Sequence, residues 1–199
     1  LHIGLVVHNL PSYSQTFITN KIKVLINSGY KVSLFVSSKK KHSERLTFKN
    51  VNVYYQLKSN DSACNLAYKF LFLFLKRPFK VINFIYYELS REKNIFKIFG
   101  KILINYHFFL VKNLDWIHFA FATLGLKREN IGKVINAKVS CSFRGYDITQ
   151  HPKNNKNVYD VLFSELHKIH TISDFLYEQA LLLGLNKSIL VRKIYPAIN

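Results

Sequence analysis

An apolar strand, an amphipathic helix and a second apolar strand open the chain, and this order constrains the fold most. Residues 3–7 are continuously apolar, as expected of a strand buried on both faces of a parallel sheet. Ile18 and Ile22 then lie on one helical face, and Gly29 is placed to end the helix in a left-handed turn. Residues 31–36 (KVSLFV) follow as a second strand. Such a βαβ unit is right-handed and its strands are parallel.

The same alternation returns after residue 114. We predict strands and helices in turn: strand 115–122 (DWIHFAFA), helix 125–137, strand 138–143 (KVSCSF), helix 158–168, strand 169–173 (IHTIS), a helix from Ser173 to Gly184, and a last strand or linker at 189–196. Between the two alternating parts, 51–55 reads as a short strand and 61–114 as helical, with Pro78 and Gly100 dividing it into three helices. The sequence therefore predicts an α/β protein with a Rossmann-like, doubly wound parallel sheet and helices on both faces. Residues 1–195 form one domain in this interpretation.

The charge and the cysteines limit the partners and the compartment. The net charge of +18 favours a polyanionic partner: nucleic acid, an anionic membrane surface or a phosphorylated substrate. The two cysteines show no CxxC spacing, which disfavours a disulfide framework or a zinc site and favours a reducing cytoplasm. The opening residues lack a signal-peptide pattern, and no apolar run reaches the roughly 20 residues that span a bilayer.

Polar residues follow the predicted strands at one edge of the sheet, where open α/β sheets bind ligands. The candidate substrate-binding residues are Ser12, Ser14, Gln15, Arg144, Gly145, Asp147 and Ser173, and the candidate catalytic residues are His118 and Arg144. Arg144 suits a bidentate grip on a phosphate or carboxylate, and Gly145 allows a ligand to approach the backbone. Asp147 suits sugar hydroxyls or the orientation of Arg144, and His118 suits hydrogen bonding or proton transfer near neutral pH.

Each of these residues also has a plain structural interpretation. Ser12, Ser14 and Ser173 suit helix caps, with Ser12 and Gln15 spaced as a capping box. His118 suits a hydrogen-bonded core position, and Arg144 and Asp147 suit a pair across a turn. The histidines show no metal-ligand spacing, and no Walker A, GxGxxG, GxSxG or HExxH motif is present. We therefore expect no metal and no cofactor, and a kinase or dehydrogenase is disfavoured.

Four ordered segments resemble the retaining glycosyltransferases of family four, which have the two-domain GT-B fold. PSYSQTFITNKIKVLINSGYKV resembles their P-x-x-S-E-T-F-I…L-x-x-x-G-H-x-V opening, and DWIHFAFATLG resembles D-x-I-H-A-H-F-A-x-x-G. SFRGYDIT resembles T-F-H-G-x-D-I, and IHTISDFLYEQALLLGL resembles V-x-x-x-S-E-x-L-x-x-x-L-x-x-L-G. The terminal IYPAIN resembles the segment that leads into the second domain, so 196–199 would begin a linker.

The resemblance implies the acceptor-side, N-terminal half of a GT-B hexosyltransferase. Such an enzyme moves a sugar from a nucleotide-sugar to a glycan or lipid-linked acceptor with retention, in cell-surface polysaccharide or lipopolysaccharide biosynthesis. The donor-binding, C-terminal domain would act in cis, and this half alone would be inactive. The sequence departs from the family pattern at Gln15, at Ala120 in place of the second histidine, at Arg144 and at Asn199.

The basic, aromatic section at 61–114 suggests a membrane contact. Lysines interleaved with Phe and Leu suit helices that lie in an anionic bilayer interface, and the candidate contacts are Lys69, Lys76, Arg77 and Lys80. The protein is then expected in the cytoplasm, at the inner face of the cell membrane. Two alternatives stay open. One is a basic nucleic-acid-binding module, which is disfavoured because no RNP, KH or helix-turn-helix pattern appears. The other is a non-catalytic remnant that binds a membrane or a partner.

Overall fold

The sheet is seven-stranded and fully parallel, in the order β3-β2-β1-β4-β5-β6-β7. The computed structural model describes residues 1–10, 16–38, 51–57 and 61–195. Its strands are β1 His2–Val7, β2 Lys31–Val36, β3 Asn52–Tyr55, β4 Trp116–Phe119, β5 Lys138–Phe143, β6 Lys168–Thr171 and β7 Leu190–Lys193. The strand order reverses between β1 and β4, which defines the topological switch point of a doubly wound sheet. The predicted fold class is confirmed.

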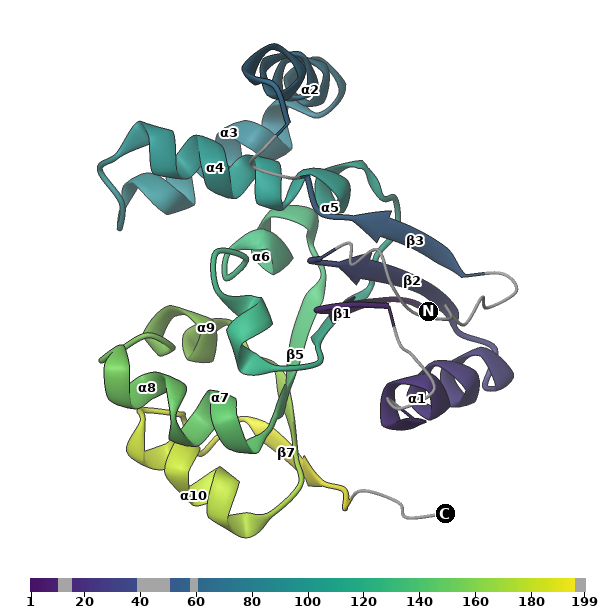
Figure 1. The fold of residues 1–199 in the computed structure, drawn as a ribbon, viewed down its shortest axis with the longest axis vertical. Coiled ribbons are helices and arrows are strands. Elements are labelled where there is room, and N and C mark those ends of the chain that lie inside the picture. The colour runs from purple at the N-terminus through teal and green to yellow at the C-terminus, as the bar shows by residue number, and fades with distance from the viewer. Residues whose placement is uncertain (11–15, 39–50, 58–60, 196–199) are drawn as a thin grey trace.

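Helices cover both sides of the sheet. They are α1 Thr16–Asn27, α2 Ala63–Lys76, α3 Pro78–Leu89, α4 Ile95–Ile104, α5 Tyr106–Leu110, α6 Ile131–Ile135, α7 Gly145–Thr149, α8 His151–Asn154, α9 Asp160–Glu165 and α10 Asp174–Leu182, with a 3₁₀ turn, η1, at Ala122–Gly125. Figure 1 shows α1 on one side of the sheet and α6 to α10 on the other. It also shows α2 to α5 gathered at one end of the molecule, above α6 and β3.

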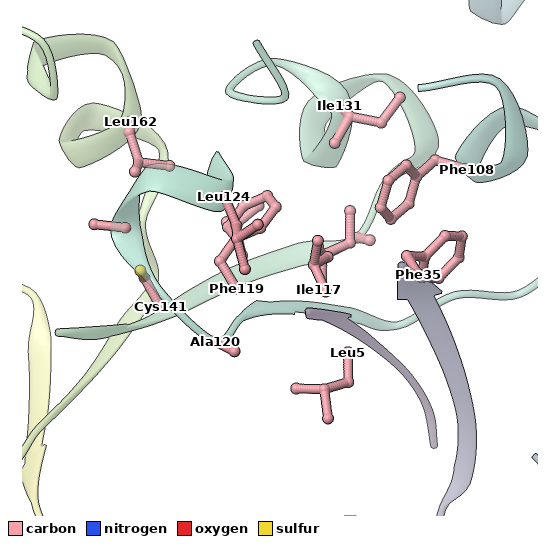
Figure 2. Close-up of a cluster of buried hydrophobic side chains, with 14 of the residues drawn as sticks. Leu5, Phe35, Phe108, Ile117, Phe119, Ala120, Leu124, Ile131, Cys141 and Leu162 are labelled. Atoms are coloured by element: carbon pink, nitrogen blue, oxygen red, sulfur yellow. The ribbon is translucent and has the colours of Figure 1, made fainter. Parts of the chain in front are cut away.

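Alternation along the strands divides the buried side chains between the two sides. Figure 2 shows Ile117, Phe119, Leu124 and Ile131 on the side of α6 and η1, whereas Leu5 lies on the opposite side. Each of these side chains is removed from water, which contributes roughly 2 kcal/mol for a large apolar side chain. The main core therefore lies between the sheet and the helices that follow β4, β5 and β6.

The helical section formed by α2 to α5 is fixed to this core by buried contacts. The ring of Phe108 on α5 stacks on Phe35 of β2 with centroids 4.0 Å apart. The buried carboxylate of Glu88 on α3 accepts hydrogen bonds from Lys101 of α4 at 2.5 Å and from Asn130, just before α6, at 2.9 Å. Within the described residues, no helix has the length and hydropathy that crossing a membrane requires.

Several sequence predictions of helix and strand ends are confirmed. Gly29 and Gly184 adopt positive φ angles of 79° and 95° at the ends of α1 and α10, as the αL turn requires. Ser173 caps α10, and Pro78 is the first residue of α3. The last predicted segment forms strand β7.

Several predictions were wrong. Residues 61–114 contain four helices rather than three, and the strand predicted at 115–122 ends at Phe119. Gly100 does not divide two helices, because α4 runs through it. The break lies earlier, at Asn94. Its side-chain oxygen caps α4 by accepting hydrogen bonds from the backbone N–H groups of residues 96 and 97. The helix predicted at 125–137 is only five residues long, since the chain first turns through positive φ at Lys127 and ends at Asn136 in the left-handed region. The turn across which Arg144 and Asp147 were expected to pair is the start of the short helix α7. The linker predicted at 196–199 lies outside the described residues.

Candidate functional site

The candidate residues after the strands lie at the edge that contains the switch point between β1 and β4. Arg144 and Gly145 directly follow β5, and Ser173 follows β6 by two residues. Ser12, Ser14 and Gln15, predicted to bind substrate after the first strand, lie outside the described residues. The described part of the site is therefore formed by β4, β5, β6 and α1.

His118 lies at the centre of a polar network on the side of the sheet that faces α1. In the parallel register His118 is beside Ser140 on β5, and Ser142 is beside His170 on β6. The ring nitrogens of His118 lie 2.8 Å from the Ser140 Oγ and 3.0 Å from the Ser142 Oγ. Ser142 in turn lies 2.9 Å from the Nδ1 of His170. Alternate positions of three neighbouring strands thus build one hydrogen-bonded layer.

Lys21 of α1 completes this network and fixes the tautomer of His118. Its Nζ lies 2.9 Å from the Nε2 of His118 and 3.5 Å from the Ser142 Oγ. An ammonium group can only donate, so Nε2 must accept and the proton of the neutral ring must sit on Nδ1, facing Ser140. Both ring nitrogens of His118 are therefore occupied in this conformation.

Burial and neighbouring cations keep the histidines of this network neutral. Desolvation, followed by the charge of Lys21, lowers the pKa of His118 well below its ordinary value. The same two causes lower the pKa of His170 to about 4. Desolvation, followed by the charge of Arg144, lowers the pKa of Lys21 to about 8. At neutral pH the network therefore contains neutral imidazoles and a mostly protonated lysine.

Arg144 places a second cation beside Lys21. Its guanidinium carbon lies 4.3 Å from the ring centroid of Phe17, which precedes Lys21 by one turn of α1. The Arg144 Nε is buried without a hydrogen-bond partner, and among the described residues no carboxylate forms an ion pair with Arg144 or Lys21. Two neighbouring cations without an ion-pair partner favour an anionic or electron-rich ligand group.

Asp147 is occupied by the protein itself. Its buried carboxylate accepts hydrogen bonds from the backbone N–H of Ala122 at 2.6 Å and of Arg144 at 2.8 Å. The Tyr159 hydroxyl donates to its backbone oxygen at 2.7 Å. Desolvation outweighs these bonds and raises the pKa of the carboxyl group to about 6. In this structure Asp147 ties the turn after β4 to the start of α7, and it orients the Arg144 backbone rather than the guanidinium.

Helix capping explains Ser173, whereas packing within the described chain does not explain Gly145. A Cβ added at Gly145 would meet no atom within 4 Å, so packing inside the described chain does not explain a glycine there. The Ser173 Oγ accepts from the backbone N–H of Leu176 at 3.3 Å, which is an ordinary N-cap. Gly145 therefore leaves open space next to Arg144, while Ser173 serves the helix that it begins.

A cavity of about 460 Å³ opens beside the polar network, within the size range of small-molecule sites. Polar groups of the network line it: Lys21, His118, Ser140 and His170. Apolar side chains, among them Leu5 and Ile194, form other parts of its wall. A ligand in this cavity would contact both the cationic and the apolar surface. In the described part of the chain, no group of three or more His, Cys, Asp or Glu side chains is arranged to hold a metal ion.

The predicted membrane-contact residues lie on the helical section, apart from this site. Lys69 and Lys76 are on α2, Arg77 separates α2 from α3, and Lys80 is on the first turn of α3. Lys69 forms an ion pair with Asp61 at 3.1 Å, and Lys76 lies 5.9 Å from the centroid of the Phe72 ring.

Sequence reasoning missed Lys21, Ser140, Ser142 and His170. A signal existed for the strand residues, because Ser140 and Ser142 occupy alternate positions of an otherwise apolar strand, as a polar layer on one face requires. Lys21 carried no such signal, since lysines on helices are usually solvated.

Comparison with known proteins identifies the fold. No protein-family model matches the sequence, and no curated protein matches it. Among solved structures, a part of sucrose-phosphate synthase from Thermosynechococcus elongatus aligns over 100% of this chain and 91% of its own length, with a TM-score of 0.54 and 13% identity. The lipopolysaccharide outer core galactosyltransferase WaaB aligns over 100% of this chain and 46% of its own length, with a TM-score of 0.54 and 15% identity.

This chain has the fold of one half of a GT-B glycosyltransferase. It spans about half the length of the complete enzymes, covering 48% of the full sucrose-phosphate synthase chain and 46% of WaaB. At this identity the likeness extends to the GT-B fold and not to a substrate.

Proposed function

We propose that this GT-B half binds the acceptor of a sugar-transfer reaction, with Lys21 and Arg144 as its principal ligand contacts. The observation that carries the proposal is the pair of cations without an ion-pair partner, at the end of β5 and on the facing side of α1. Lys21 also lines the mostly apolar cavity between α1 and the sheet. Hydroxyl and phosphate oxygens of a glycan or a lipid-linked acceptor would satisfy the donors that the protein leaves unpaired.

The rest of the network would hold these cations in place. His118 accepts from Lys21 and is itself positioned by Ser140, so the Lys21 ammonium has a fixed direction and one N–H left for a ligand. For His118 to contact a substrate directly, it must exchange one of its present partners. We therefore propose His118 as the residue that orients Lys21, and as a catalytic group only after such an exchange.

The complete reaction needs a donor half. We propose that a second domain in cis binds the nucleotide-sugar, that transfer retains the anomeric configuration without metal or cofactor, and that this half alone is inactive. Family-four motifs support retention, and a role in cell-surface polysaccharide or lipopolysaccharide assembly follows from the same resemblance. The open space at Gly145 suits a sugar that approaches the backbone beside Arg144.

The test uses the full-length protein, a panel of nucleotide-sugars and lipid-linked acceptors, and the variants Arg144→Gln and Lys21→Met. Each should lower kcat/KM about 100-fold or more, because a charged contact in a desolvated site is lost. Lys23→Met is the matched control, since Lys23 lies on the same helix but is exposed. Urea unfolding should show that both site variants stay folded. Parent-like transfer by folded variants would refute the assignment, and a parent without transfer on any pair would favour a binding protein.

A further inference from the structure

Three helices at one end of the molecule leave large apolar side chains in solvent. Phe96 at the start of α4 is 87% exposed, and Phe79 on α3 is 81% exposed. Further exposed apolar residues of this section are Tyr68, Leu71, Leu75, Ile82, Tyr86 and Ile95. Figure 1 shows that α2, α3 and α4 lie together, at the end of the molecule away from α10. An apolar surface of this extent on a folded domain indicates a partner.

The exposed side chains form a stripe along each of the first two helices. Tyr68, Leu71 and Leu75 on α2 follow the spacing i, i+3, i+7, which places them on one helical face. Phe79, Ile82 and Tyr86 repeat the same spacing on α3. Different residues hold these helices on the core: Leu73 of α2, and Val81, Phe84 and Glu88 of α3, are buried. The stripes are therefore free of the domain and run along the helix axes.

Unpaired cations surround the stripes. The three acidic residues between 61 and 105 each pair with a lysine of the same section: Asp61 with Lys69, Glu88 with Lys101, and Glu92 with Lys97. Among the described residues, no carboxylate pairs with the other five cations, which are Lys76, Arg77, Lys80, Arg91 and Lys93. The section is thus positively charged next to its exposed apolar side chains.

We propose that α2, α3 and the start of α4 dock the protein on an anionic phospholipid membrane. Helices too short to cross a bilayer, with an apolar stripe along the axis and basic residues beside it, lie in the plane of the interface. The aromatic rings then sit at headgroup depth, and the free cations attract the anionic lipid. This inference is independent of the proposed sugar transfer.

A bilayer suits this surface better than nucleic acid does. Single-stranded nucleic acid also uses basic residues and aromatic rings, on which bases stack. Aliphatic side chains cannot stack on bases, yet four of them are about half or more exposed beside the rings: Leu71, Leu75, Ile82 and Ile95. The sequence predicted contacts at Lys69, Lys76, Arg77 and Lys80; the structure makes Lys69 the weakest of these, since it is already paired. Phe79 and Phe96 become the main expected anchors.

The experiment measures co-sedimentation of the full-length protein with vesicles of phosphatidylcholine alone or mixed with phosphatidylglycerol. We expect binding to the mixed vesicles, weakened by added salt. Phe79→Ser and Phe96→Ser should each lower the partition coefficient about tenfold, because a large apolar side chain no longer inserts. The double variant Lys76→Gln with Arg77→Gln should reduce binding to mixed vesicles by a similar factor.

Matched controls remove the same groups elsewhere on the surface. Phe175→Ser removes an exposed aromatic ring from α10, and Lys153→Gln with Lys156→Gln removes two exposed charges near α8. These controls should bind like the parent. Three results would overturn the proposal: no binding of the parent to mixed vesicles, equal loss in docking and control variants, or tighter binding of a single-stranded oligonucleotide that the docking variants also abolish. No result depends on a nucleotide-sugar, so failure here leaves the transfer proposal intact.

Discussion

Replacing Glu88 by alanine should destabilise the protein by about 3–5 kcal/mol, because a buried ion pair would lose one partner. The Glu88 side chain is 1% exposed and lies 2.5 Å from the Lys101 Nζ, whose own side chain is 22% exposed. Its other carboxylate oxygen accepts from the buried amide of Asn130. Alanine leaves both donors unpaired. Because part of Lys101 reaches solvent, we expect a loss near the lower end of this range.

Asp61→Ala is the matched control for Glu88→Ala. Asp61 pairs with Lys69 at 3.1 Å in the same helical section, but the two side chains are 29% and 25% exposed. An ion pair of this exposure contributes under about 1 kcal/mol. The double variant Glu88→Met with Lys101→Met should recover part of the loss, because apolar side chains replace the unpaired charge.

Urea unfolding followed by circular dichroism measures these differences in the free energy of unfolding. A loss in Glu88→Ala that lies within about 1 kcal/mol of the loss in Asp61→Ala would refute the reasoning. It would mean that the carboxylate does not hold α3 and α4 on the sheet, and the proposed docking surface would then lack a rigid base.

Two further predictions concern packing and pH. Gly132→Ala should lower the free energy of unfolding by about 1–3 kcal/mol, because the added Cβ would lie 2.3 Å from a methyl carbon of Val139 on β5. Gly100→Ala should raise it by up to about 1 kcal/mol, because the added Cβ meets no atom within 4 Å and alanine favours the helix. Equal effects of the two variants in urea unfolding would contradict this. The free energy of unfolding should fall as the pH drops from about 6.5 toward 4. Burial lowers the pKa of His170 to about 4 and that of His118 well below its ordinary value. The unfolded chain therefore binds more protons than the folded protein in this pH range, and acidification favours unfolding. Burial also lowers the pKa values of His2 and His107, which act in the same direction. Asp147, with its pKa raised to about 6, acts in the opposite direction but is one group against four histidines. His170→Gln should flatten this dependence, and a parent that gains stability on acidification would disprove it.

Local patterns were sufficient for most of the sheet. Strands at 31–36 and 138–143 were predicted with their observed ends, since a buried parallel strand is a continuous apolar run between polar residues. Gly100 misled the prediction because a glycine inside a helix costs only about 1 kcal/mol, which the packing of α4 outweighs. The cap that begins α4, at Asn94, was visible in the sequence as a polar residue before an apolar run.

The sequence by itself determined the alternation of strands and helices, the parallel sheet and the edge at which polar residues gather. These features depend on periodicity and on turn residues that act over a few positions. The tertiary structure alone decided that Lys21 lies against His118, 97 positions later, and that Asp147 turns inward to backbone N–H groups. It also decided which side of α2 and α3 faces solvent, because all sides of these helices carry apolar residues. Strand order and packing fix such contacts, and no spacing within one segment encodes them.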